Sequence, residues 1–148
     1  MDALINDLTV FSRRQRKHGI QPCARLDGTS DTGMAAKIAT QFPEIQFYDY
    51  TKVIKRAYQD RPSNYHITLS YSEADPDYAE QVLQAVRDTG VNAAVVFRDK
   101  LPETFKGLPV VDGDKDDLRF LDPKGVIVGL IAKGKKAKAD TSGFVIDC

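Results

Sequence analysis

Polar and ionisable side chains stand at or just after the ends of the segments expected to form buried strands. Asp27 and Asp31 belong to the first such end, Asp49 and Lys52 to the second, and Ser70 to the third. Ligands of open parallel sheets bind outside the carboxyl ends of the strands, where the loops converge. We therefore expect these five side chains to lie together and bind an anionic or hydroxyl-rich ligand. The competing interpretation is that each separately caps a helix or stabilises a turn.

The most acidic stretch of the chain is residues 110–125, and its spacing superficially resembles a calcium loop. It contains Asp112, Asp114, Asp116 and Asp117. An EF-hand is excluded because no Glu stands at the twelfth position and no flanking helix pair is expected. A looser carboxylate site for a divalent metal is one alternative. We favour a tight turn at 112–114, with Arg119 paired to one carboxylate, and the acidic side chains available to a partner.

Two short basic runs offer a second kind of binding surface. The first consists of Arg13, Arg14, Arg16 and Lys17, and the second of Lys133, Lys135, Lys136 and Lys138. Such runs usually form a solvated face, and cations at the end of a helix also complement its dipole. If both runs lay on one face they would suit the phosphates of a nucleic acid.

The cysteines and histidines indicate neither a cofactor nor a catalytic group. Cys23 and Cys148 are far apart, and neither has metal-ligand spacing with His18 or His66, so we expect no zinc or iron–sulfur site. Cys23 is expected to be a small buried hydrophobe, and neither thiol to be essential. His66 is interpreted as a satisfied core histidine and His18 as a helix-terminal side chain. No residue is assigned a catalytic role, and no cofactor is expected.

The composition is that of an ordinary globular protein. The 148 residues include 21 Lys plus Arg and 21 Asp plus Glu, which gives a formal net charge of zero. No overall field therefore attracts nucleic acid or anionic lipid. We find no leader sequence and no apolar stretch of the ~18 residues expected of a membrane span. One domain covering residues 1–148, in the cytoplasm of a host cell and without membrane contact, is the expectation.

Periodicity predicts a single α/β domain with a mostly parallel central sheet, flanking helices and a β-rich C-terminal third. The expected helices cover residues 2–17 and 76–89, with a shorter one around 35–39 and at most one short helix between 50 and 64. The expected strands are 22–27, 45–50, 64–71, 92–97, 108–111, 125–132 and the final FVI. The lysine run before FVI is expected to be an exposed loop.

Several stretches resemble a family of phage and plasmid proteins related to gene product 88. They are RLDGTSD, FPEIQFYDYTK, NYHITLSYSE, GLPVVDGDKDDLRFLDP, GVIVGLIAKGK and DTSGFV, and together they span nearly all of residues 20–146. The resemblance implies a mobile-element origin. Longer members carry a preceding cysteine-rich segment, which implies a metal or iron–sulfur site on a partial βα barrel. This sequence is expected to lack that segment and its chemistry.

These observations support three functional hypotheses. The first is a non-enzymatic phage or plasmid protein that binds a host protein or ribonucleoprotein, for example as an inhibitor of a defence system such as a CRISPR effector. It follows from the retained scaffold, the missing cysteines and the absence of a recognisable catalytic pair. The second is a phosphate- or nucleotide-handling enzyme that uses the strand-end aspartates, Lys52 and the acidic stretch, with or without a divalent metal. The third is nucleic-acid binding through the two basic runs.

Overall fold

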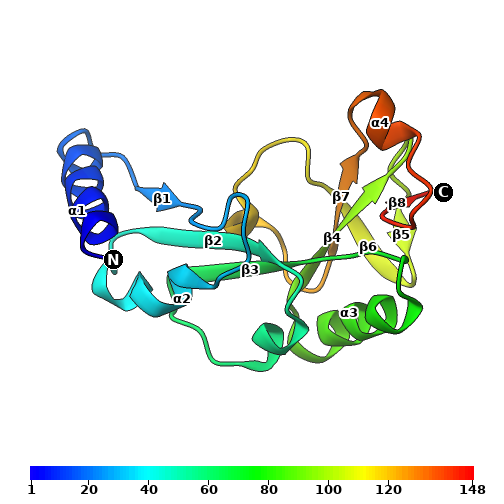
Figure 1. Ribbon diagram of the computed structural model, residues 1–148, viewed down its shortest axis with the longest axis horizontal. Helices are drawn as coiled ribbons and strands as arrows, with labels where there is room; N and C mark the ends of the chain where they lie inside the picture. Colours follow the sequence, from blue (N-terminus) through cyan, green and yellow to red (C-terminus); the bar gives the residue numbers. More distant parts are fainter. The chain divides into compact units, whose positions relative to one another are not determined.

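The computed structural model describes all 148 residues, which form two compact units (Figure 1). The first unit contains Met1–Asp49 and Arg61–His66, and the second contains Tyr50–Asp60 and Ile67–Cys148. The helices are α1 (Asp2–Lys17), α2 (Met34–Ile38), α3 (Pro76–Thr89) and α4 (Gly134–Lys138), with 3-10 turns η1 (Ala39–Gln41), η2 (Ile54–Tyr58) and η3 (Arg119–Leu121). None of the helices is long and apolar enough to cross a membrane.

The strands are β1 (Cys23–Ala24), β2 (Gln46–Thr51), β3 (Tyr65–Ser70), β4 (Asn92–Phe97), β5 (Thr104–Phe105), β6 (Leu108–Asp112), β7 (Ile127–Ile131) and β8 (Val145–Ile146). They form one eight-stranded sheet in the order β1-β2-β3-β4-β7-β6-β5, and β8 also pairs with β4. The β4 pairings with β3, β7 and β8 are parallel, and β5–β6 is an antiparallel edge. The prediction of a mostly parallel α/β sheet with a β-rich C-terminal third is therefore confirmed.

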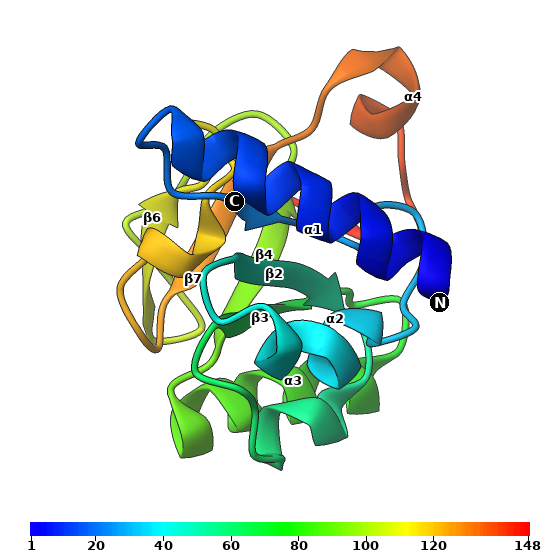
Figure 2. The same ribbon diagram turned by 90° about the vertical axis from the view of Figure 1, so that its left-hand side faces the viewer.

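Helix α1 begins and ends where the sequence predicts. Its buried residues are Leu8 and Ser12, and the Ser12 hydroxyl donates a 2.7 Å hydrogen bond to Glu44. The helix ends at His18 and Gly19, and Gly19 has a φ of 67°, which favours glycine. Figure 2 shows α1 above β2 and α2 below it, so helices cover both faces of this strand.

Helix α3 has a complete set of end signals and packs on the second unit's strands. The Asp75 carboxylate accepts the backbone N–H groups of Asp77 and Tyr78, Pro76 occupies the first turn, and Gly90 ends the helix with a φ of 74°. Figure 1 shows α3 below β4, and the buried face of α3 consists of Ala79, Val82, Leu83, Ala85 and Val86. Strand β4 is almost entirely buried, as expected for a central parallel strand.

Three expectations about local structure were wrong. The first strand covers only Cys23–Ala24 and not residues 22–27, and in the loop beyond it the Asp27 backbone N–H donates to a side chain, Asp49, and not to a strand carbonyl. The lysine run forms the short exposed helix α4 instead of a loop, consistent with the good helix propensity of Lys and Ala. Cys23 is only partly buried, and the edge strand β5 was not predicted.

Candidate functional site

The loop after β1 is organised around the carboxylate of Asp27, which is 3% exposed. Its Oδ1 accepts the hydroxyls of Ser30 at 2.8 Å and Thr32 at 2.7 Å, and its Oδ2 accepts the backbone N–H of Gly33 at 2.7 Å. Gly33 has a φ of 69° and precedes α2. Asp27 thus joins the end of β1 to the start of α2, and both of its oxygens are used for this.

Asp49 is the second buried carboxylate of this region, and it is 1% exposed. Its Oδ1 accepts the backbone N–H of Asp27 at 3.0 Å, whereas its Oδ2 is buried without a hydrogen-bond donor in bonding geometry. Burial raises the pKa of Asp49, the Asp27 N–H opposes this rise, and the charge of Asp27 adds to it. The Tyr65 hydroxyl and the Arg25 guanidinium act in the lowering direction.

The two carboxylates titrate in opposite directions. Burial works to raise the pKa of Asp27, but the hydrogen bonds from Thr32, Ser30 and Gly33 outweigh it, and the net result is a lowered pKa. A pair of acids with separated pKa values is a feature of acid–base sites. Here, however, the donors around Asp27 all come from its own loop, which points to a structural role for that residue.

The other three residues predicted to bind a ligand at the strand ends are Asp31, Lys52 and Ser70. Asp31 is half-buried in the same loop as Asp27. Lys52 is exposed directly after β2, and Ser70 ends β3, where its carbonyl oxygen accepts the Tyr78 hydroxyl. Lys52 and Ser70 belong to the second unit. Within the first unit, a hydrogen bond joins two members of the predicted set, Asp27 and Asp49.

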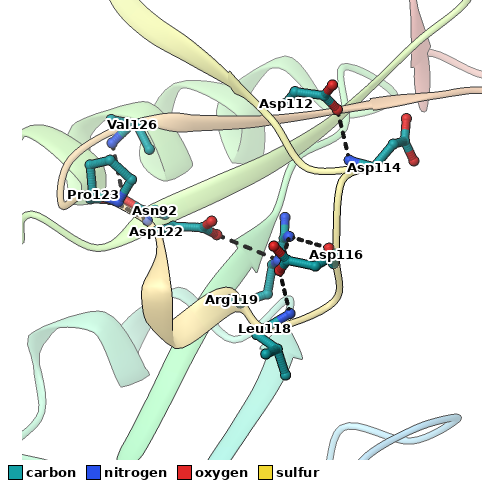
Figure 3. Close-up of polar contacts among 9 residues, drawn as sticks. All are labelled: Asn92, Asp112, Asp114, Asp116, Leu118, Arg119, Asp122, Pro123 and Val126. Atoms are coloured by element: carbon teal, nitrogen blue, oxygen red, sulfur yellow. Dashed lines mark hydrogen bonds and ion pairs between the residues drawn. The ribbon is translucent and has the colours of Figure 1, made fainter.

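The acidic stretch folds around the guanidinium of Arg119, as Figure 3 shows. Arg119 is 1% exposed; its Nε lies 3.4 Å from Asp122 Oδ2 and its Nη2 lies 3.6 Å from Asp116 Oδ1. Nη2 also donates to the backbone oxygen of Asp116. The prediction that Arg119 pairs with a carboxylate of this stretch is confirmed, and two carboxylates take part.

The turn at residues 112–114 is also present. The Asp112 carboxylate accepts the backbone N–H of Asp114 at 2.9 Å, a side-chain-stabilised turn. Asp114 accepts the Ile131 N–H at 2.9 Å and pairs with Lys133 at 3.2 Å. Asp117 is exposed, and its backbone oxygen accepts the Arg119 N–H. The Asp112 carboxylate is thus used by its own loop and the Asp114 carboxylate by Ile131 and Lys133, and no group of three or more His, Cys, Asp or Glu side chains is placed to hold a metal ion.

Sequence reasoning missed two polar side chains that position this loop and the C-terminal segment. Buried Asn92 donates to the Pro123 carbonyl at 2.7 Å and accepts the Val126 N–H at 2.9 Å, so it holds the end of the acidic loop on β4 (Figure 3). Arg98 pairs with Asp147 and donates to the carbonyls of Lys138 and Asp140. The role of Asn92 could have been suspected from the sequence, because it is a polar residue in an otherwise apolar strand.

The basic run of α1 forms one exposed face, whereas that of α4 is a short exposed helix. At about 100° per residue, the four α1 cations fall within an arc of about 160°. Arg13, Arg14, Arg16 and Lys17 are all exposed, and Val10, which is 57% exposed, lies inside the same arc. In the second run, Lys133 pairs with Asp114, while Lys135, Lys136 and Lys138 are exposed on α4.

The fold and these sites define a mostly parallel α/β protein whose buried carboxylates organise loops and whose charged helices face solvent. The model of the family Gene product 88 matches residues 1–148, and the chain belongs to this family. The match includes α1, which precedes the stretches that carried the resemblance. No curated protein matches the chain, and no solved structure does.

Proposed function

We propose that this protein is a non-enzymatic interaction protein of a phage or plasmid, acting in the host cytoplasm, that binds a host macromolecule through the basic face of α1. We define this face as Arg13, Arg14, Arg16 and Lys17. The observation that carries the proposal is that these cations are exposed together on one side of a well-anchored helix, and that Arg13, Arg14 and Lys17 form no ion pair within the chain.

The chemistry of the face suggests an anionic partner. Guanidinium groups bind carboxylates and phosphates through paired hydrogen bonds, and arginine is enriched in protein interfaces. Val10 adds an exposed apolar contact between the cations. A host protein with an acidic surface or a ribonucleoprotein fits this chemistry. Inhibition of a defence ribonucleoprotein such as a CRISPR effector is the specific form of the proposal, and the phage-style name of the family supports such an origin.

The enzymatic alternative has less support. Its central residue, Asp27, has both carboxylate oxygens bonded to donors of its own loop, and the carboxylates of Asp112 and Asp114 already accept backbone N–H groups. A substrate or metal would have to displace these contacts.

The proposal is tested by affinity purification of the tagged protein from host cells. We compare the wild type with the triple variant Arg13→Gln, Arg14→Gln and Lys17→Gln. The matched control removes the same charge from the other helix: Lys135→Gln, Lys136→Gln and Lys138→Gln. Circular dichroism establishes that all three proteins are folded.

We expect a stoichiometric host protein or ribonucleoprotein to elute with the wild type and the control, and to be lost from the α1 variant. Equal recovery from the α1 variant contradicts the proposal. Recovery that nuclease treatment abolishes, with a strong dependence on salt, indicates the nucleic-acid alternative instead. A bound nucleotide or metal in place of a macromolecule indicates the enzymatic one.

A further inference from the structure

The second unit contains a cavity of about 280 Å³, and none of the residues that line it was predicted to bind a ligand. It is lined by Tyr71, Glu73, Pro76, Ala79, Glu80, Leu83 and Lys106. Tyr71 and Glu73 directly follow β3, and the other side comes from the first turns of α3 and the turn between β5 and β6. The cavity therefore lies at the carboxyl end of a parallel strand, where α/β proteins bind ligands.

The cavity exists because β3 leaves the sheet before β4 ends. Strand β3 pairs with β4 at positions 92–94, and β8 pairs with Val96 and Phe97 of the same strand. Since β7 occupies the other side of β4 over positions 93–97, β8 takes the place that β3 vacates. The chain after β3 thus turns away from the sheet, towards the start of α3.

Part of the cavity lining is apolar or aromatic. Tyr71 is 2% exposed and contacts Phe105 edge-to-face, with ring centroids 5.4 Å apart, and Phe105 contacts Phe97 in the same way. Ala79 and Leu83 of α3 complete this part of the lining. Edge-to-face aromatic contacts of this kind favour one relative orientation of the rings.

The rim carries both signs of charge. The Tyr71 hydroxyl donates a 2.9 Å hydrogen bond to Glu73 Oε1, and the Lys106 ammonium lies 3.8 Å from the same oxygen, too far for a hydrogen bond. Glu80 lies on α3, where Arg87 contacts it at 3.5 Å. Burial and the Glu73 bond raise the pKa of Tyr71, so it stays a neutral donor. Glu73, Glu80 and Lys106 can each accept a further partner.

Hydrogen bonds tie down the backbone at the two residues, Glu73 and Lys106, that carry these charges. The Glu73 N–H donates to the Gly143 carbonyl at 2.7 Å, and Gly143 has a φ of 95° and packs directly against the backbone of Ala74. Lys106 has a φ of 51° in the two-residue turn between β5 and β6, and its carbonyl accepts Arg87 Nη2 at 3.2 Å. Arg87 thereby ties the turn to α3.

We propose that this cavity binds a small zwitterion with an apolar side chain, of the free α-amino acid class. The ammonium group would lie between Glu73 and Glu80, the carboxylate would meet Lys106, and the side chain would cover Tyr71 and Leu83. A volume of about 280 Å³ is just below the ~300–1,000 Å³ typical of ligand pockets, and suits an amino acid better than a nucleotide. The proposal of this ligand site does not rest on the function proposed for the α1 face.

The test is calorimetric titration of the full chain with L-phenylalanine and two probes that each lack one charge, phenethylamine and hydrocinnamate. We expect saturable binding of L-phenylalanine and at least about tenfold weaker binding of each probe, equivalent to about 1.4 kcal/mol. No saturable binding of L-phenylalanine overturns the proposal. Equal binding of either probe also overturns it, since one charge is then not recognised.

Variants locate the binding site. Glu73→Gln and Lys106→Met should each weaken L-phenylalanine binding about tenfold or more, equivalent to about 1.4 kcal/mol, without lowering the melting temperature appreciably. The matched controls are Glu103→Gln and Lys115→Met, which change exposed residues outside the cavity. If the cavity variants bind as tightly as these controls, the ligand occupies another place and the assignment fails.

Discussion

The backbone N–H of Asp27 donates a 3.0 Å hydrogen bond to the carboxylate of Asp49, and this bond joins the loop after β1 to β2. The two acids use their carboxylates differently. The Asp27 carboxylate accepts three hydrogen bonds from its own loop. The Asp49 carboxylate accepts the backbone N–H of Asp27 with one oxygen, and its other oxygen is buried without a hydrogen-bond donor. Their contributions to stability should therefore depend on pH in opposite ways.

Asp27→Ala should destabilise the protein by roughly 1–3 kcal/mol at pH 7, because the loop donors lose a charged acceptor. A lowered pKa in the folded state means that the ionised group stabilises above its unfolded pKa and that this stability is lost as pH falls through the folded value. The deficit of the variant should thus shrink below a pH of about 4. Urea unfolding at several pH values measures it, and a deficit that does not change with pH would contradict this account.

Asp49→Asn should raise the midpoint of urea unfolding at pH 7. The pKa of Asp49 is raised by burial, so its ionised form costs stability above the folded pKa, and the cost disappears as pH falls. Asparagine keeps the oxygen that accepts the Asp27 N–H and removes the charge. The advantage of the variant should vanish in acid. As a control, Asp49→Ala leaves that N–H without its acceptor and should cost about 1–3 kcal/mol.

Much of the fold could be predicted because local signals and periodicity agree. Helices α1 and α3 combine apolar periodicity with clear end residues, and β4 is a continuous apolar run. Strand β1 was overestimated: it ends at Ala24, and Asp27, three residues further on, lies in the following loop and donates its backbone N–H to the Asp49 carboxylate. The β5–β6 turn was missed because its central residues are Lys106 and Gly107, not the usual Asn-Gly or Asp-Gly.

The candidate site was harder to predict than the fold. The pairing of Arg119 with a carboxylate could be predicted, since opposite charges lie close together in that stretch of the sequence. The five strand-end side chains were expected to lie together, and the bond from the Asp27 backbone to Asp49 joins two of these residues. The cavity at Tyr71 could not be predicted from residue types. Glu73 and Lys106 approach each other only because the β5–β6 hairpin forms at the sheet edge and because β3 leaves the sheet before β4 ends. The strand end containing Glu73 was noticed, but its partner comes from an element that sequence patterns did not reveal.

Val95→Asp should unfold the protein. Val95 is fully buried in β4, and an unpaired carboxylate there costs several kcal/mol, comparable with a total stability of ~5–15 kcal/mol. Val10→Asp is the control, because this side chain is 57% exposed on α1 and such a change should stay within about 0.5 kcal/mol. Melting followed by circular dichroism measures both, and a folded Val95→Asp protein with an unchanged melting temperature would be the contrary result.

Arg119→Met should cost roughly 3–5 kcal/mol, because it removes the only cation close to the half-buried carboxylate of Asp122. Burial already raises the pKa of Asp122 even though Arg119 opposes the rise. Without Arg119 that pKa should rise further, so the deficit should shrink as pH falls and Asp122 becomes protonated. Adding Asp122→Asn should recover part of the loss, with a coupling of about 0.5–3 kcal/mol in a double-mutant cycle measured by urea unfolding. Strictly additive losses would mean that the ion pair contributes nothing and that Arg119 acts only by filling space against Gly113.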